Sequence, residues 1–275
     1  MFHVKSLWNP KEAKKYKSRL ELLAYRSRLI GSEPKLCVWG GGNTSTKTLE
    51  RDHRGKVRRV LRIKGSGSDL KVSQPQHFPP VLIDDLMDLL KRKTMSDEAM
   101  VDYVQKCLLE PKAPRPSIEV LLHAFVDQND IDHTHADAIL AITNNHHGRE
   151  IARKIYGNEL IWVPYVKPGF TLSKWMYEAY QKNPNAKGAI LENHGLITWG
   201  SEPRISYTRT IEMISRAEAY LKRAERKRKQ WNPLLYKPLT QSDASAWIDE
   251  HVPYIREVIS RRQKALLHVN RSKEV

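Results

Sequence analysis

Along most of the chain, apolar residues recur at one of two spacings, one typical of helices and one typical of strands. Apolar residues three or four positions apart predict amphipathic helices, and these cover residues 11–30, 97–109, 117–128, 136–144, 171–182, 203–229 and 242–264. Alternating or β-branched runs predict extended segments, which are a hairpin over 44–63 and strands at 131–135, 159–165, 188–193 and 196–200. Because strands and helices interleave, we expect one α/β domain over residues 1–275 with a helical start at about 10–30.

Three local signals mark where the predicted helices begin or stop. Thr94 and Asp97 have the spacing of a capping box before the helix at 97–109. Ser117, after the proline-rich connector at 110–116, is expected to open the next helix. Pro253 is expected to interrupt the last helix, because proline removes a backbone donor.

Composition limits the class of protein. The chain has 275 residues, of which 40% are hydrophobic, which is enough for a packed core. The sequence has no run of eighteen apolar residues, so no membrane span is expected. The N-terminal segment also lacks the pattern of a signal peptide. Cys37 and Cys107 make no disulfide framework, and we expect a cytoplasmic protein.

The chain carries a net charge of +16, from 47 Lys and Arg against 31 Asp and Glu. Such an excess can attract nucleic acid, an anionic membrane or small phosphorylated substrates. Part of it lies in the basic run at 221–229, at the end of a predicted helix, where cations suit the helix dipole. A solvated helix face is favoured there over a nucleic-acid patch, since no known nucleic-acid-binding motif occurs in the sequence.

The segment "DHTHADA", residues 132–138, places two histidines one residue apart. In an extended strand, His133 and His135 point to the same face and can supply two metal ligands. His194, at the end of a predicted strand, is the best candidate for a third. The alternative is that these are ordinary core or surface histidines, since the chain has 11 of them. The competing candidates for the third ligand are His123, His146, His147 and His251.

Three short loops rich in small residues are candidates for holding a phosphate. They are "WGGGNTS" at 39–45, "KGSGSD" at 64–69 and the expected helix start at Ser117. The ordinary interpretation of each is a tight turn or a helix cap. The first is neither a P-loop nor a dinucleotide fingerprint, because no GK[ST] follows it and a strand comes next.

Glu119 lies two residues after Ser117, in the first turn of the predicted helix. A carboxylate there commonly interacts with the helix dipole, and that is the simpler interpretation. If the start of this helix faces a metal, Glu119 becomes a candidate general base for proton abstraction next to a carbonyl.

Taken together and in order, these motifs resemble the class II aldolase/adducin family, most of all the aldolase domain of rhamnulose-1-phosphate aldolases fused to a short-chain dehydrogenase. The similarity extends over roughly residues 15–265. The motifs are "GGNTS" at 41–45, "KGSGSDL" at 64–70, "PSIE" at 116–119, "HTHADA" at 133–138 and "ENHGLI" at 192–197.

This resemblance implies a fold and a set of roles. The fold would be a three-layer α/β/α sandwich around a mostly antiparallel sheet. Glu119 would be the catalytic acid/base. His133, His135 and His194 would bind Zn²⁺ or another divalent transition metal, and the substrate phosphate would bind at Gly42, Asn43, Ser66, Gly67 and Ser117. One departure is Ile118, where fuculose-phosphate aldolases often have a second serine.

The implied reaction is cleavage of a ketose 1-phosphate, here L-rhamnulose 1-phosphate, to dihydroxyacetone phosphate and L-lactaldehyde. The resemblance also implies a homo-oligomer, usually a tetramer. The lack of an apolar span and of nucleic-acid-binding motifs argues against a membrane or nucleic-acid partner. The alternatives are another sugar-phosphate aldolase, an epimerase or a dehydratase of the same family, or an adducin-like interaction module without chemistry. The 275 residues contain no nucleotide fingerprint, so no NAD is assigned, whether or not a dehydrogenase domain follows in a longer protein.

Overall fold

The computed structural model describes residues 4–38, 41–227 and 240–261. The chain divides into two compact units, residues 1–227 and residues 228–275, and each is described by itself. The prediction of one domain over residues 1–275 stays a prediction. No helix among the described residues has both the length and the apolar character needed to cross a membrane.

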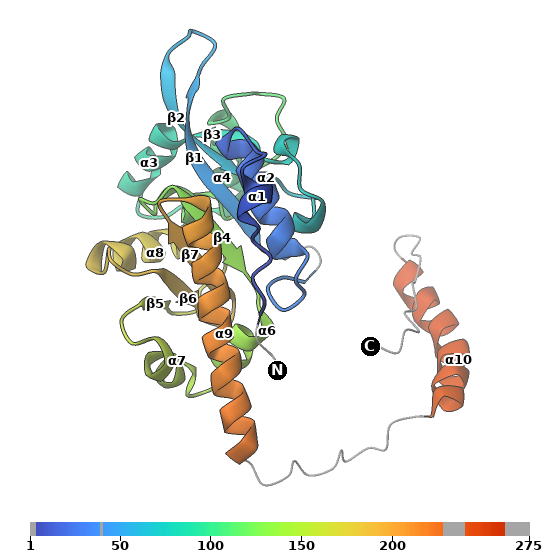
Figure 1. The fold of residues 1–275 in the computed structure, drawn as a ribbon. Helices are drawn as coiled ribbons and strands as arrows, with labels where there is room; N and C mark the ends of the chain where they lie inside the picture. The colour runs from blue at the N-terminus through green and yellow to red at the C-terminus, as the bar shows by residue number, and fades with distance from the viewer. Residues whose placement is uncertain (1–3, 39–40, 228–239, 262–275) are drawn as a thin grey trace. The chain divides into compact units, whose positions relative to one another are not determined.

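A seven-stranded sheet forms the centre of the first unit (Figure 1). The strand order is β3-β2-β1-β4-β7-β6-β5, and every neighbouring pair is antiparallel except β5 and β6. The strands are β1 (Asn43–Arg51), β2 (Val57–Ile63), β3 (Pro80–Leu82), β4 (Asp130–Thr134), β5 (Leu160–Val163), β6 (Gly188–Leu191) and β7 (Gly195–Gly200). The predicted hairpin and the four other predicted strands are confirmed, whereas β3 was not predicted.

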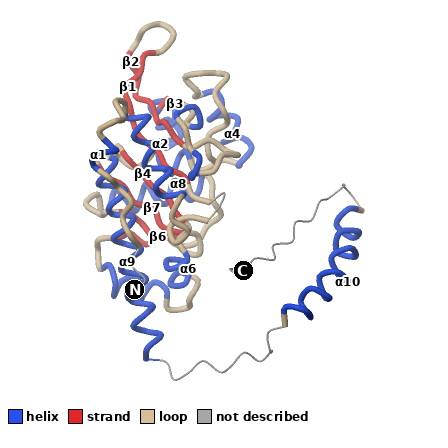
Figure 2. The backbone as a smooth tube through the Cα atoms, turned by 45° about the vertical axis from the view of Figure 1, so that its right-hand side comes forward, coloured by secondary structure: helices blue, strands red, loops and turns tan. Residues whose placement is uncertain are grey.

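Helices cover both faces of the sheet, as the turned view shows (Figure 2). One layer contains α2 (Arg19–Gly31), α6 (Asp137–Thr143), α7 (Gly148–Tyr156) and α9 (Pro203–Lys227). The other contains α3 (Ile83–Met87), α4 (Asp97–Lys106), α5 (Val120–Ala124) and α8 (Phe170–Lys182). Along β7, Leu196 packs with the helix layer that contains α9, and Ile197 and Trp199 pack with the layer that contains α8. Successive side chains of a strand point to opposite faces of the sheet. The predicted three-layer α/β/α sandwich with a mostly antiparallel sheet is confirmed.

Short helical segments link these elements: α1 (Pro10–Ala13), η1 (Leu70–Val72), η2 (Pro75–His77) and η3 (Asp88–Lys91). The single helix predicted over 11–30 is therefore wrong, since α1 and α2 are separate. Ser18 starts the second of them, because its hydroxyl accepts from the Glu21 backbone N–H while the Glu21 carboxylate accepts from the Ser18 backbone N–H.

Two other predicted helix starts are wrong. The cap of α4 is Ser96, which accepts from the Ala99 N–H, and not the Thr94–Asp97 pair. The helix expected from Ser117 begins only at Val120, because the Ser117 N–H donates to the Lys64 carbonyl at 3.1 Å and keeps this segment beside the end of β2. Glu119 therefore occupies the N-cap position and not the first turn.

In the second unit, the described residues form α10 (Gln241–Ser260). The helix continues through Pro253, so the predicted interruption there is wrong. A proline inside a helix can bend it without ending it. Residues 228 and 229 of the predicted helix at 203–229, and residues 262–264 of the predicted helix at 242–264, lie outside the described residues. The helix α7 was not predicted.

The pairing of β4 with its two neighbours positions the site. Asn43 of β1 lies opposite His133, and Ile197 of β7 lies opposite His133 on the other side. The start of β1, the end of β4 and the turn before β7 thus meet at one end of three adjacent strands. The sequence spacing alone could not show this meeting.

Candidate active site

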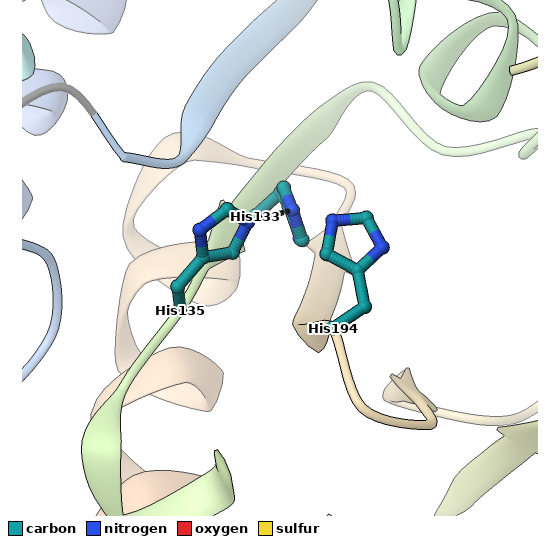
Figure 3. Close-up of side chains that lie close together, drawn as sticks. All are labelled: His133, His135 and His194. Carbon is teal, nitrogen blue, oxygen red and sulfur yellow. Dashed lines mark hydrogen bonds between the residues drawn. The ribbon is translucent and has the colours of Figure 1, made fainter. Parts of the chain in front are cut away.

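The three predicted histidine ligands lie together at this end of the sheet (Figure 3). His133 is the fourth residue of β4, His135 follows the strand, and His194 lies in the turn before β7. One ring nitrogen from each lies within 4.8 Å of the other two. The Nε2 atoms of His133 and His135 are 2.9 Å apart. This arrangement can hold a divalent metal ion with three imidazole ligands.

Two features of His133 suit metal binding. Its Nδ1 lies 3.0 Å from the Leu196 carbonyl oxygen, and an Nδ1–H donated to that oxygen leaves the Nε2 lone pair facing the other rings. Burial lowers the pKa of His133 to about 3, and burial also lowers the pKa of His135. Both rings are therefore neutral at neutral pH, which is the state that binds a metal.

The turn that carries His194 has an unusual backbone. Asn193 adopts a positive φ of 52°, which is uncommon for a residue other than glycine. A side chain at Gly195 would come within 2.4 Å of the Thr134 carbonyl oxygen, so only glycine fits there. The sequence "NHG" thus brings β7 close to β4 and places His194 beside His133.

Glu119 lies against the histidines, as the hypothesis of a general base requires. Its Oε1 is 3.1 Å from His194 Nε2 and 3.5 Å from His133 Nε2, without the alignment of a hydrogen bond. Its Oε2 accepts a hydrogen bond from Asn43 Nδ2 at 2.5 Å. Burial acts to raise the pKa of Glu119, but His133, His194 and Asn43 outweigh it and hold this pKa below its usual range. Glu119 is therefore an ionised, oriented carboxylate.

The three predicted phosphate loops converge beside Glu119. Asn43 Nδ2 also lies 3.3 Å from Ser117 Oγ. The Ser66 N–H donates to the Arg115 carbonyl at 2.9 Å, which ties the "GSGS" loop to the segment before Glu119. Gly67 has a φ of 83° and open space where a side chain would project. Their role in binding a phosphate stays a prediction.

Gly42 shows why the first loop needs glycine. Its φ is 65°, and a side chain there would lie 2.6 Å from the His133 carbonyl oxygen. The loop therefore lies directly against the backbone of β4 at His133. The departure from the family at Ile118 is also visible, because this side chain is 40% exposed and supplies no hydroxyl beside Ser117.

The competing histidines lie in other settings. His123 is fully buried on α5, and its Nδ1 lies 2.8 Å from Ser45 Oγ. Burial lowers the pKa of His123 to about 3. His146 and His147 are exposed next to α7, and His251 belongs to the second unit. None of these four belongs to a group of three potential metal ligands among the residues that the structure describes.

Two buried basic residues near these strands were missed in the sequence. Lys64 is a buried lysine at the start of "KGSGSD", and its position directly before the glycine-serine loop was the available signal. Arg26 is fully buried and forms ion pairs with Asp130 at 2.6 Å and Asp132 at 2.8 Å, on the strand that carries His133. An arginine inside an amphipathic helix gives no such signal in a single sequence.

Comparisons with known proteins identify the class. The family model "Class II Aldolase and Adducin N-terminal domain" matches residues 21–221. The "N-terminal Class II Aldolase domain of a conserved protein" from Thermoplasma acidophilum is 42% identical, with a TM-score of 0.74, over 79% of this chain and 99% of that chain. The chain therefore belongs to the class II aldolase and adducin family, as the motifs in the sequence predict.

Two further comparisons extend this result. The "Uncharacterized oxidoreductase YuxG" of Bacillus subtilis (strain 168) is 44% identical over 264 residues, which are 96% of this chain and 38% of that protein. The chain thus spans well under half the length of this relative. A sugar-phosphate aldolase from Thermotoga maritima has a TM-score of 0.58 at 15% identity, over 80% of this chain and 98% of that chain, and shares the fold.

Proposed function

We propose that this protein is a metal-dependent aldolase that cleaves a ketose 1-phosphate, with L-rhamnulose 1-phosphate as the first substrate to test. The products would be dihydroxyacetone phosphate and L-lactaldehyde. The observation that carries this proposal is the convergence of three histidine rings with the carboxylate of Glu119, 3.1 Å from His194. Membership of the family and the sugar-phosphate aldolase of similar fold support the reaction class.

His133, His135 and His194 would hold the metal, for which zinc is the first candidate because neutral imidazoles suit it. When bound, the metal would supply Lewis-acid stabilisation of negative charge on the substrate's carbonyl and hydroxyl oxygens. The hydrogen bond from His133 to the Leu196 carbonyl would fix the ring orientation during this chemistry.

Glu119 would be the general acid/base. Breaking the C3–C4 bond leaves the electron pair on C3, which becomes the enediolate of dihydroxyacetone phosphate and must gain a proton to give the product. Glu119, which is ionised at rest, would take this proton from solvent water and deliver it to C3, and the proton of the C4 hydroxyl would return to solvent. Its Oε1 is buried beside the histidine nitrogens without an aligned hydrogen bond. Asn43 would orient the carboxylate through Oε2. The group that exchanges the proton of the C4 hydroxyl is not assigned.

The substrate phosphate would lie against Gly42, Asn43, Ser66, Gly67 and Ser117. The Gly42 and Gly67 N–H groups and the Ser66 and Ser117 hydroxyls would supply donors to the phosphate, whereas the Ser66 and Ser117 N–H groups donate to the Arg115 and Lys64 carbonyls. The hydrogen bonds that tie the loop at Ser66 to the segment at Ser117 support this placement. The assembly as a homo-oligomer, with a tetramer as the usual family form, and the cytoplasmic location are parts of the same proposal.

The test is cleavage of L-rhamnulose 1-phosphate by the zinc-loaded protein, with dihydroxyacetone phosphate measured by a coupled reductase. Cleavage that disappears on chelation and returns with zinc supports the proposal. Zinc-loaded protein that converts the sugar phosphate without cleaving it would instead be an epimerase or dehydratase of the same family. Folded protein that binds no metal and converts no sugar phosphate would instead fit an interaction module.

A further inference from the structure

The helix α10 of the second unit carries a continuous apolar stripe. Its members recur at spacings of four and three residues, which place them on one side of a helix. They are Ile248, Val252, Ile255 and Ile259. Ile255 is 38% exposed and Ile259 is 51% exposed. The described residues of this unit are α10 and its two end residues, so they supply no second element that covers the stripe.

The composition of α10 makes it a weak helix without a partner. Isolated helices of about 12–15 residues are marginal in water even when they are rich in alanine. The helix α10 has 20 residues, but Pro253 removes one backbone donor from its middle. The stripe consists of β-branched residues, which lower helix propensity. The helical state of this segment is therefore stabilised by a surface that buries the stripe.

Two charged residues beside the stripe point to a second copy of the same helix. Asp249 and Arg256 are exposed and flank the stripe on one side. When the stripe fills the core positions of a heptad repeat, both residues occupy the same flanking position, at which charges set the partner and its direction. In an antiparallel pair with Val252 opposite Ile255 of the other copy, each Asp249 lies beside the other copy's Arg256. One such pair of helices therefore contains two complementary charge pairs.

The opposite flank of the stripe favours the same arrangement. The Trp247 ring stacks on the His251 ring, with centroids 4.4 Å apart, and Val258 follows on this side. In the antiparallel pair, His251 of one copy meets Val258 of the other, which extends the apolar contact. A parallel pair would place His251 beside the other copy's Arg256, where it supplies no opposite charge. The charges therefore select the antiparallel direction.

We propose that α10 is a self-association element, which pairs antiparallel with α10 of a second copy of this chain. The two apolar stripes form the core of the contact, and the Asp249–Arg256 pairs set its direction. The candidate active site belongs to the first unit, so the inference does not depend on the proposed reaction.

The test measures the distance between the two helices in the full chain by pulsed electron paramagnetic resonance. A nitroxide is attached at Ser242→Cys, an exposed position away from the stripe, while both natural cysteines are buried. Antiparallel pairing in this register separates the two labels by about 35 Å along the helix axis, at about 1.5 Å per residue. Parallel pairing places them at the same level, within about 20 Å. The expected result is a defined distance of about 35 Å or more.

Charge reversal tests whether the proposed pairs set the direction. Asp249→Arg and Arg256→Asp should each weaken the pairing about tenfold, because two attractive pairs become repulsive. The double variant Asp249→Arg/Arg256→Asp should recover it. The two residues lie about 10.5 Å apart along their own helix, so this recovery requires a second copy. Glu250→Arg, which changes a charge on the outer side of α10, is the matched control and should change nothing.

A change within the stripe tests the apolar contact. Ile255→Asp should weaken the pairing by about 100-fold or more, because each pair of helices loses two buried isoleucines. Circular dichroism of the labelled proteins reports whether the helix itself persists. If Ile255→Asp unfolds the helix, Ile255→Ala takes its place.

Three results would overturn the inference. The first is a distance within about 20 Å, which would show a parallel pair. The second is the absence of a defined distance in wild type, which would mean that another surface covers the stripe. The third is a double charge variant that stays helical but does not recover the wild-type distance.

Discussion

The two faces of β4 carry two buried polar clusters with opposite properties. On one face, Asp130 and Asp132 form ion pairs with Arg26, and Ser206 Oγ donates to Asp132 at 2.7 Å. On the other face, His133 meets His135 and His194, and the Glu119 oxygen nearest to the rings has no aligned hydrogen bond. Neighbouring residues of a five-residue strand thus belong to two different environments.

The two clusters show that buried polar side chains can serve either the fold or a binding site. The arginine cluster pairs its charges within the chain, which is what a buried charge needs to be tolerated. The histidine cluster brings together ring nitrogens that burial keeps neutral, and a metal cation bound between them would stabilise this arrangement. We therefore propose that the first cluster holds β4 in place and that the second binds a metal.

The largest expected effect comes from breaking the structural cluster. Arg26→Met leaves the buried carboxylate of Asp132 without its cation and leaves Asp130 with Arg19 alone. Breaking a buried ion pair in this way typically costs about 3–5 kcal/mol. The free energy of unfolding from urea titration should fall by about this amount, and activity should be lost with the fold. Arg54→Met, in the exposed hairpin turn, is the control and should change stability by less than about 0.5 kcal/mol. A stable Arg26→Met protein would contradict the structural assignment.

The next largest effect is expected from a change beside the histidine cluster that leaves the fold intact. Glu119→Gln keeps the size of the side chain but cannot move a proton, so kcat should fall by about 10²- to 10⁴-fold. The free energy of unfolding should change far less than in Arg26→Met, and zinc content should be retained. A variant that keeps wild-type kcat would remove Glu119 from the mechanism.

A smaller effect concerns His123, a buried histidine outside both clusters. Its folded-state pKa of about 3 lies below the ordinary value of 6.5, so between these values the unfolded chain binds a proton that the folded chain does not. The free energy of unfolding should therefore decrease as the pH falls below about 6.5. His123→Asn can keep the contact with Ser45 but does not titrate.

Between pH 7 and pH 5.5, the loss of stability should be smaller in His123→Asn than in wild type by about 1 kcal/mol. Urea titrations at the two pH values measure it. The exposed His147→Asn variant should behave as wild type does. An equal loss of stability in wild type and His123→Asn would show that the histidine is not held neutral by burial.

The smallest effect restores a hydroxyl that the family pattern often has. Ile118 is partly exposed next to Ser117, so Ile118→Ser costs little packing. One added hydrogen bond to the phosphate is worth about 1 kcal/mol, which would lower KM for the sugar phosphate about fivefold. An unchanged KM would mean that the phosphate does not reach this position. Ile118→Ala is the matched control for the loss of the larger side chain.

The sequence predicted the site better than it predicted the local structure around it. The spacing of His133, His135 and His194 with their neighbouring motifs was informative because family motifs preserve order along the chain. The predicted start of α5 was wrong because the true start depends on the hydrogen bond from the Ser117 N–H to the Lys64 carbonyl. These two residues lie 53 positions apart in the sequence and meet only in the folded chain. Local capping signals cannot report such a tertiary contact.

The same limit explains the two missed residues. Lys64 and Arg26 look like surface residues in the sequence, because lysine and arginine are rarely buried. Their burial depends on partners from other elements, namely Ser117 and Thr44 for the first and Asp130 and Asp132 for the second. A charged residue within a predicted amphipathic helix or at a strand end therefore needs the three-dimensional structure before it can be assigned a role.

The most direct test of the contrast between the two faces of β4 is the metal content of the purified chain. After loading with zinc and dialysis, mass spectrometry should find about one zinc ion per chain, with three nitrogen ligands by X-ray absorption. The variant His133→Ala/His135→Ala should lose this zinc and keep its fold, whereas the matched control His146→Ala/His147→Ala should retain it. Folded wild-type protein that binds no zinc or other divalent metal, or zinc retained by the first double variant, would contradict the account.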